Sequence, residues 1–302
     1  MRLHLLPEPG SELITARAPG ILPDFAKADY AVLRRQGENL RSAYVSVAEP
    51  CGGEAVITSL RRLECDAAPE TGAVGLEITS PAGTDYLFSA VRPGLVVFRT
   101  ASGEEVRLAG QFGFVRMAGG KVTRAVLVGG TELSLGPVKL SAPTATFEAG
   151  VTALDHGRFE LTLDKDLPAG IEGSMAYVSR DGYSHNSPYR IASIAGKKLV
   201  VDADFVLGRG QVGDAKPSAP DAIMNVVPFP WAVRVNGMPS SYFRGKLISN
   251  DRTGRSSTVI DIEKDQRTVH VKAPSLFRAG DAFTVYDVQR GDCVRIPTLL
   301  MR

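Results

Sequence analysis

Apolar and polar side chains alternate over short runs along most of the chain, and glycine, aspartate or proline separates the runs. This period of two is typical of half-buried β-strands, because successive side chains of a strand point to opposite faces. Valine, isoleucine, phenylalanine and tyrosine dominate the runs, as expected for strands. The strands predicted in the first part of the chain are 2–6, 12–18, 30–35, 42–49, 54–64, 73–79, 85–91 and 94–100. Further predicted strands are the runs "EVRLAG", "QFGFVRMAG", "KVTRAVLVGG", "TELSLG" and "VKLSA".

The connections between these runs predict hairpins. The segments 101–105 ("ASGEE") and 118–122 ("AGGKV") have the composition of hairpin turns. Turns recur about every 8–12 residues, which is the spacing of a sandwich or barrel. A helical period can be imposed on 23–43, but the β-branched and aromatic content of that segment disfavours a helix. The sequence therefore predicts an all-β fold.

The stretch 29–50, "DYAVLRRQGENLRSAYVSVAEP", predicts two strands around a polar turn. Tyr30 and Val32 share one face of the first strand by their spacing. Three interpretations stay open for this stretch: a hairpin, part of a binding face, or a piece of a larger block. The residues expected on one face of the second strand are Ala43, Val45 and Val47.

The pattern changes near Pro143, where large apolar residues become fewer before a second series of strands begins. A Gly/Pro/Asp-rich segment, 208–221, interrupts that series. We predict an antiparallel β-sandwich over 1–147 and a second, smaller sandwich-like or barrel-like β domain over 148–302. No repeat of fixed period is present, which disfavours propellers and solenoids.

Composition and charge exclude several classes of partner. The net charge is +2 and there is no basic block or nucleic-acid-binding motif, so no nucleic-acid partner is predicted. No run approaches the roughly 20 apolar residues of a membrane span, so no membrane partner is predicted. The first apolar run is short and is broken by Pro7, unlike a signal peptide. The cysteines lack metal-ligand spacing; Cys51 and Cys65 could pair or, like Cys293, remain free thiols.

A succession of motifs spans 29–63. A strand ending in two arginines leads into a glycine turn; "SAYVSVAEP", a Gly-Glu turn and "ITSLRRL" follow. This succession resembles the β-sandwich region of the heparinase II/III-like family of polysaccharide-degrading proteins. The resemblance covers the start of the chain closely and the rest of the first half loosely. The matching residues are Arg34, Arg35, Gly37, Ser42, Tyr44, Val45, Val47, Glu49, Pro50, Gly53, Glu54, Ile57, Ser59, Leu60, Arg62 and Leu63.

The resemblance implies that the catalytic residues lie mainly in a domain other than this one. Members of the family have an α/α toroid followed by β domains, and the toroid carries the general-acid tyrosine and much of the sugar cleft. A further catalytic histidine, and zinc in some members, belong to a His- and Asp-rich stretch early in the sandwich. This chain shows no toroid-like helical region and no such stretch. The resemblance therefore assigns no catalytic residue, metal or cofactor here.

The function that the resemblance implies is that of the C-terminal β portion of a polysaccharide lyase-like protein, inactive alone. It would support or shape a cleft for an acidic polysaccharide, next to a toroid domain. Members of the family are typically periplasmic or secreted. Two alternatives are an autonomous carbohydrate-binding module and a self-assembling structural β module, which would form a homo-oligomer through open sheet edges.

One segment combines the residue types that lyases use as acid and base, commonly histidine and tyrosine. "SRDGYSHNSPYR" contains Tyr183, His185 and Tyr189, which form either a polar loop between strands or a substrate contact. The other histidines are isolated. His270 alternates with valines and is expected on an exposed strand face, and no metal site is predicted.

Two Arg-Arg pairs, 34–35 and 61–62, lie on predicted neighbouring strands. Either they form surface ion pairs, or Arg35 and Arg62 contact the carboxylate of an acidic sugar, which suits the planar guanidinium. The carboxylates predicted as ion-pair partners are Glu38, Glu49 and Glu54.

Trp231 directly follows a Pro-Phe-Pro run, 228–230, and could either stack on a sugar ring or close a core. Tyr242 and Phe243 allow the same two interpretations. A carbohydrate-binding module requires an exposed aromatic platform, for which Trp231, Tyr242 and Tyr183 are the candidates.

Overall fold

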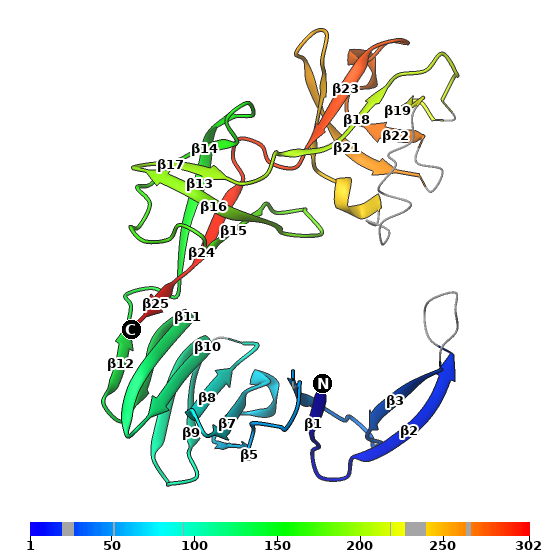
Figure 1. The fold of residues 1–302 in the computed structure, drawn as a ribbon. Helices are drawn as coiled ribbons and strands as arrows, with labels where there is room; N and C mark the ends of the chain where they lie inside the picture. The colour runs from blue at the N-terminus through cyan, green and yellow to red at the C-terminus, as the bar shows by residue number, and fades with distance from the viewer. Residues whose placement is uncertain (20–26, 51, 93, 218, 227–239, 264–266) are drawn as a thin grey trace. The chain divides into compact units, whose positions relative to one another are not determined.

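The computed structural model describes the chain except for residues 20–26, 51, 93, 218, 227–239 and 264–266. The described residues form antiparallel strands and three short 3-10 helices, with no α-helix, so the predicted all-β fold is confirmed. The chain divides into two compact units (Figure 1). One is Met1–Ala145 together with Thr298–Arg302, and the other is Thr146–Pro297. The division lies close to the boundary predicted near residue 147.

A nine-stranded antiparallel sheet dominates the first unit. Its strands are β5 (Ser59–Arg62), β6 (Glu64–Cys65), β7 (Val74–Ser80), β8 (Gly83–Ser89), β9 (Leu95–Arg99), β10 (Glu105–Ala118), β11 (Lys121–Leu135), β12 (Val138–Ser141) and β25 (Leu299–Met301). The 3-10 helix η1 (Pro69–Thr71) precedes β7. Four runs that the sequence predicts as separate strands are merged in the two long strands β10 and β11.

The long strands allow the sheet to fold over itself. The first part of β10 pairs with β9, and its second part pairs with β8. Phe88 of β8 and Phe98 of β9 meet with ring centroids 5.1 Å apart, although their strands do not pair with each other. Both rings belong to one buried apolar core. Strands that pair with different parts of β10 therefore contribute side chains to one shared apolar core.

Both predicted hairpin turns are present. Segment 101–105 joins β9 to β10, where Arg99 pairs with Glu105 across the turn. Gly119 and Gly120 join β10 to β11 with φ values of 56° and 70°. Glycine adopts this left-handed conformation without the steric penalty that other residues incur, which explains the Gly-Gly pair.

The hairpin interpretation of 29–50 is wrong. β3 (Lys27–Arg34) pairs with β2 (Glu12–Pro19), whereas β4 (Val45–Glu49) pairs with β1 (Arg2–Leu6). The polar segment between β3 and β4 is therefore a connection between two separate strand pairs. The predicted faces of the later strand are confirmed, because Val45 is buried and Tyr44 is exposed.

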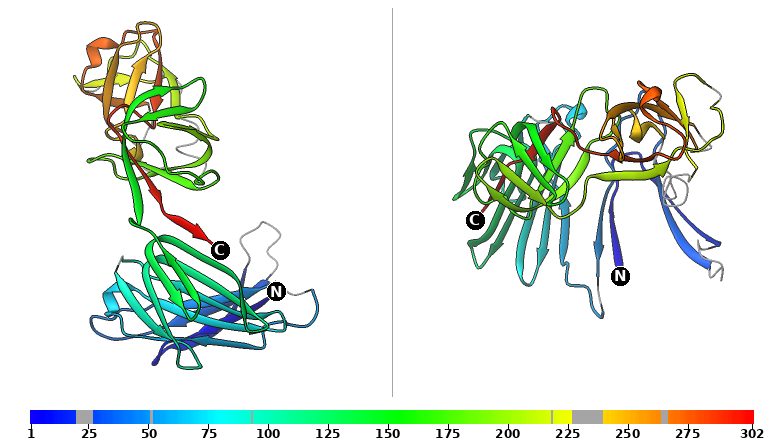
Figure 2. Two further views of the ribbon diagram at one scale, coloured as in Figure 1. Left: turned by 90° about the vertical axis from the view of Figure 1, so that its left-hand side faces the viewer. Right: turned by 90° about the horizontal axis from the view of Figure 1, so that it is seen from above.

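The second unit contains two β modules, seen from two sides in Figure 2. The first is a closed barrel of β13 (Thr146–Asp155), β14 (Glu160–Leu163), β17 (Lys198–Val201), β16 (Ser187–Ala195), β15 (Met175–Ser179) and β24 (Cys293–Pro297). The second is a sheet of β18 (Val206–Gln211), β23 (Ala282–Tyr286), β20 (Leu247–Asn250), β21 (Ser256–Ile262), β22 (Thr268–Val271) and β19 (Ala222–Met224). The short helices η2 (Ser240–Phe243) and η3 (Pro274–Leu276) accompany this sheet. Each module has its own apolar core.

Candidate functional site

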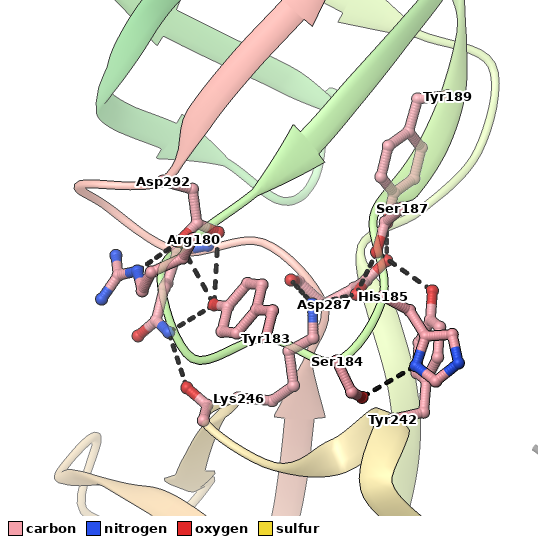
Figure 3. A network of polar contacts seen from close by, with 12 residues as sticks. Arg180, Tyr183, Ser184, His185, Ser187, Tyr189, Tyr242, Lys246, Asp287 and Asp292 are labelled. Carbon is pink, nitrogen blue, oxygen red and sulfur yellow. Dashed lines mark hydrogen bonds and ion pairs between the residues drawn. The ribbon is translucent and has the colours of Figure 1, made fainter. Parts of the chain in front are cut away.

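Three tyrosines predicted as substrate contacts surround one buried ion pair in the second unit, Lys246–Asp287 (Figure 3). Tyr189 lies on β16 of the barrel, Tyr183 on the loop before that strand, and Tyr242 on η2. Lys246 directly precedes β20 and Asp287 directly follows β23. These strands pair, so the lysine and the aspartate lie opposite each other.

The Asp287 carboxylate accepts hydrogen bonds from both modules. Ser187 Oγ donates to Oδ1 at 2.7 Å and Tyr189 Oη donates to Oδ2 at 2.6 Å. Lys246 Nζ lies 2.7 Å from Oδ1 and also donates to the main-chain oxygen of Asp287 at 2.9 Å. The lysine and aspartate side chains are only 1% and 6% exposed. Buried charges are tolerated here because they are paired and hydrogen-bonded.

Aromatic rings enclose the ammonium group. Lys246 Nζ is 3.7 Å from the ring centroid of Tyr183 and 5.6 Å from that of Tyr242, which is cation–π geometry. Tyr242 Oη lies 3.0 Å from Ser187 Oγ. The single hydroxyl proton of Ser187 is directed at Asp287, so Tyr242 is the donor in this contact.

A second buried carboxylate, Asp292, extends the network. It accepts hydrogen bonds from Arg180 Nε at 2.6 Å, from Tyr183 Oη at 3.2 Å and from the backbone N–H of Gln289 at 2.9 Å. Burial raises the pKa of Asp292 above its ordinary value, against the opposing effect of the Gln289 N–H and Arg180. Gln289 Nε2 also donates to Tyr183 Oη at 2.6 Å.

The three tyrosines are poorly suited to proton abstraction. Burial raises the pKa of Tyr183, Tyr189 and Tyr242 above the ordinary value of 10, and the Asp287 charge raises it further for Tyr189 and Tyr242. All three therefore stay protonated at neutral pH. Each hydroxyl hydrogen is already directed at a protein acceptor.

His185 lies at the exposed rim of this network. Its Nδ1 is 2.7 Å from Ser184 Oγ, and that hydroxyl donates to the main-chain oxygen of Ser241 at 2.7 Å. The serine proton is used in the second contact, so Nδ1 of His185 must carry a hydrogen and donate to Ser184. A histidine in this tautomer does not activate the serine as a nucleophile.

Arg35 and Arg62, the predicted contacts for a sugar carboxylate, meet on Glu8 in the first unit. Arg62 Nη1 lies 3.2 Å from Glu8 Oε1, which also accepts the backbone N–H of Ala43 at 3.2 Å. Arg34 instead pairs with Glu12.

The predicted partners of these arginines, Glu38, Glu49 and Glu54, are therefore wrong. Glu8 lies 27 residues from Arg35 and 54 from Arg62, so proximity in the sequence could not identify it. Glu49 serves a different purpose and accepts hydrogen bonds from His4 and from two backbone N–H groups.

The remaining candidates are dispersed. His156 packs against Phe205 and Tyr286. His270, predicted on an exposed strand face, is only 19% exposed and hydrogen-bonds Asp221 and Glu263. Burial lowers the pKa of His270, but these two carboxylates outweigh burial and raise it overall.

Trp231 and Cys51 lie outside the described residues. Cys65 and Cys293 are free thiols. The described part of the chain contains no group of three or more His, Cys, Asp or Glu residues suited to a metal ion. No helix in that part is long and apolar enough to cross a membrane.

Comparison with protein-family models, with curated proteins and with solved structures gives no match. Functional inference therefore depends on the motifs and contacts of this chain. Lys246, Asp287 and Ser187, which organise the buried network, carry no recognisable motif in the sequence. Only their pairing across strands and modules brings them together.

Proposed function

We propose that this chain is the β-rich C-terminal part of a heparinase II/III-like polysaccharide-degrading protein. Its role is to shape one wall of a cleft for an acidic polysaccharide, without providing the acid or base of the lyase reaction. The observation that carries the proposal is the set of contacts made by Arg35, Arg62 and Glu49. These residues of the family-like motif are engaged with Glu8, His4 and the backbone, as expected of a framework.

The His/Tyr cluster supports the non-catalytic part of this proposal. Elimination at a uronate requires a base that can reach the sugar C5 proton and an acid for the leaving oxygen. Tyr183 and Tyr189 donate to buried carboxylates, and Nδ1 of His185 is engaged with Ser184. The hydrogens that these side chains could donate to a substrate are therefore already engaged in hydrogen bonds within the protein.

A pair of measurements tests the proposal. The purified chain should be retarded in native gels that contain alginate or heparin. It should also release no unsaturated uronate, measured by ultraviolet absorbance, from the same polymers. A lyase of known activity provides the substrate control. Turnover by this chain would contradict the non-catalytic role, and unretarded migration would contradict polysaccharide binding.

No observation favours the alternative of an exposed aromatic platform. Tyr183 and Tyr242 are partly buried. Each ring lies against the Lys246 ammonium group, and each hydroxyl is hydrogen-bonded within the same network. A platform requires a ring face that is open to a sugar. Trp231, the third platform candidate, lies outside the described residues.

A further inference from the structure

A hollow of about 310 Å³ lies in the first unit between segment 61–64 and segment 99–103. Three arginines are among its described lining residues, Arg61, Arg62 and Arg99, against one carboxylate, Glu64. The small residues of the β9–β10 turn line its other side. Ligand pockets begin at about 300 Å³, so the hollow can hold a small group rather than a long chain.

The side chain of Arg61 has no hydrogen-bond or ion-pair partner among the described residues, whereas Arg62 pairs with Glu8. The cross-strand neighbour of Arg61 is Glu77. The Glu77 carboxylate accepts the backbone N–H of Ala101 at 2.9 Å and forms no ion pair with Arg61. The charge of Arg61 is therefore available at the wall of the hollow.

Arg99 is only loosely engaged. Its Nη2 lies 3.3 Å from Glu105 Oε1, and both side chains are more than half exposed. Exposed ion pairs of this kind contribute little free energy, so the guanidinium can turn toward another anion. Arg61 and Arg99 thus offer two adjustable guanidinium groups at one hollow.

We infer that this hollow binds the carboxylate or sulfate group of an acidic saccharide, with Arg61 as the principal contact and Arg99 as the second. A guanidinium group offers a rigid fork of N–H donors that matches a planar carboxylate or a sulfate edge. The anion site follows from the two arginines alone. The assignment of a saccharide rests on the proposed function.

The test uses the full chain and a uronate tetrasaccharide, with affinity measured by calorimetric titration. Arg61→Ala should weaken binding about tenfold, the loss expected for one charged hydrogen bond. The affinity of Arg61→Lys should lie between that of the unchanged chain and that of Arg61→Ala, because lysine keeps the charge but lacks the guanidinium fork. Arg124→Ala is the matched control, since Arg124 on β11 is also exposed and its side chain has no hydrogen-bond or ion-pair partner among the described residues.

Each outcome separates the site from the proposed function. Binding that weakens in the Arg61 variant and not in the Arg124 variant supports the site. Equal weakening in both variants indicates general charge attraction and overturns the site, as does the absence of binding to both the saccharide and sulfate. A parallel titration with inorganic sulfate tests whether the hollow binds an anion even when the saccharide does not bind. Sulfate binding that depends on Arg61, without saccharide binding, keeps the anion site and overturns the saccharide assignment and the proposed function.

Discussion

Glu49 shows how one carboxylate can organise a segment that has little apolar core. Its Oε2 lies 2.8 Å from His4 Nε2, and its Oε1 accepts the backbone N–H groups of Val56 and Ile57. The hydrogen bond to His4, and next the Ile57 N–H, lower the pKa of Glu49 from 4.5 to about 2. A residue of the family-like motif thus ties β1, β4 and the following loop together.

Acid should loosen this segment in a defined range of pH. The folded-state pKa of Glu49 is lowered, so its contribution to stability is present above pH 4.5 and is lost as the pH falls toward 2. A carboxyl-carbon NMR titration should give Glu49 a midpoint near pH 2. The protection of the Ile57 amide against hydrogen exchange should fall over the same range, and Glu49→Ala, which removes the acceptor, should show low protection at every pH. A Glu49 midpoint near 4.5 would contradict this account.

Alkali should act on the second unit through its buried tyrosines. The pKa values of Tyr183, Tyr189 and Tyr242 are raised by burial, so the stability that these groups contribute is present below pH 10 and is lost above it. Tyrosinate absorbance should therefore rise with a late phase well above pH 10. Tyr189→Phe should remove part of that phase. Titration of all eight tyrosines in one step near pH 10 would disprove the prediction.

Residue types were easier to predict than their partners. The sequence identified the Tyr183–Tyr189 segment as chemically unusual, and the structure places it in the polar network. It could not identify Lys246 or Asp287, because a lysine before one strand and an aspartate after another have no local signature. Their roles depend on the pairing of β20 with β23, which is a long-range contact.

At the scale of elements, the Lys246–Asp287 pair joins the barrel to the six-stranded sheet through Ser187 and Tyr189 of β16. An uncompensated charge in this position has no access to water. The pair should therefore matter far more to the free energy of unfolding than an ion pair at the surface.

Removal of the lysine tests this comparison. Lys246→Met should lower the free energy of unfolding by about 3–5 kcal/mol, because it leaves the Asp287 charge buried and unpaired. Arg244→Ala provides the control, since it breaks the exposed Arg244–Asp261 pair two residues away. Urea unfolding of both variants measures the difference. Similar small decreases in the free energy of unfolding of both variants would show that the buried pair is not a major connection between the modules.

Strand existence was predicted better than strand continuity. The sequence divides β10 at Gly110 and β11 at Gly130, since glycine commonly ends a strand. In the structure these two glycines face each other where the register shifts, so they form an irregularity within continuous strands. A Cβ on Gly130 would lie 2.6 Å from the Ala109 oxygen, which explains why a side chain is absent there.

At the scale of the whole molecule, the chain leaves the first unit at Ala145 and returns to it at Thr298. β25 then pairs with β11, where Val126 faces Met301 and Val128 faces Leu299. The single boundary predicted from composition could not reveal this return. Composition reports where local patterns change, whereas a terminal strand of three residues joins its unit through pairing across the length of the chain.

The return of the C-terminus predicts a local effect of truncation. Deletion of residues 299–302 removes β25 and the paired hydrogen bonds between Ala125 and Arg302, at 2.8 and 2.9 Å. The Ala125 amide should then exchange much faster with solvent, because an edge strand leaves its outward N–H groups unpaired. Leu133, on the same strand, is the internal reference, since its pairing with Leu140 of β12 does not involve the deleted residues.

Exchange mass spectrometry or NMR on the intact and shortened chains distinguishes two roles for these residues. Faster exchange around Ala125 with unchanged exchange at Leu133 would show that β25 protects one edge of a sheet that is otherwise complete. The newly opened edge should also promote association between chains, visible by light scattering, because unpaired strand edges are templates for further pairing. Unchanged exchange at Ala125 would show instead that the C-terminal residues contribute nothing to the sheet in solution.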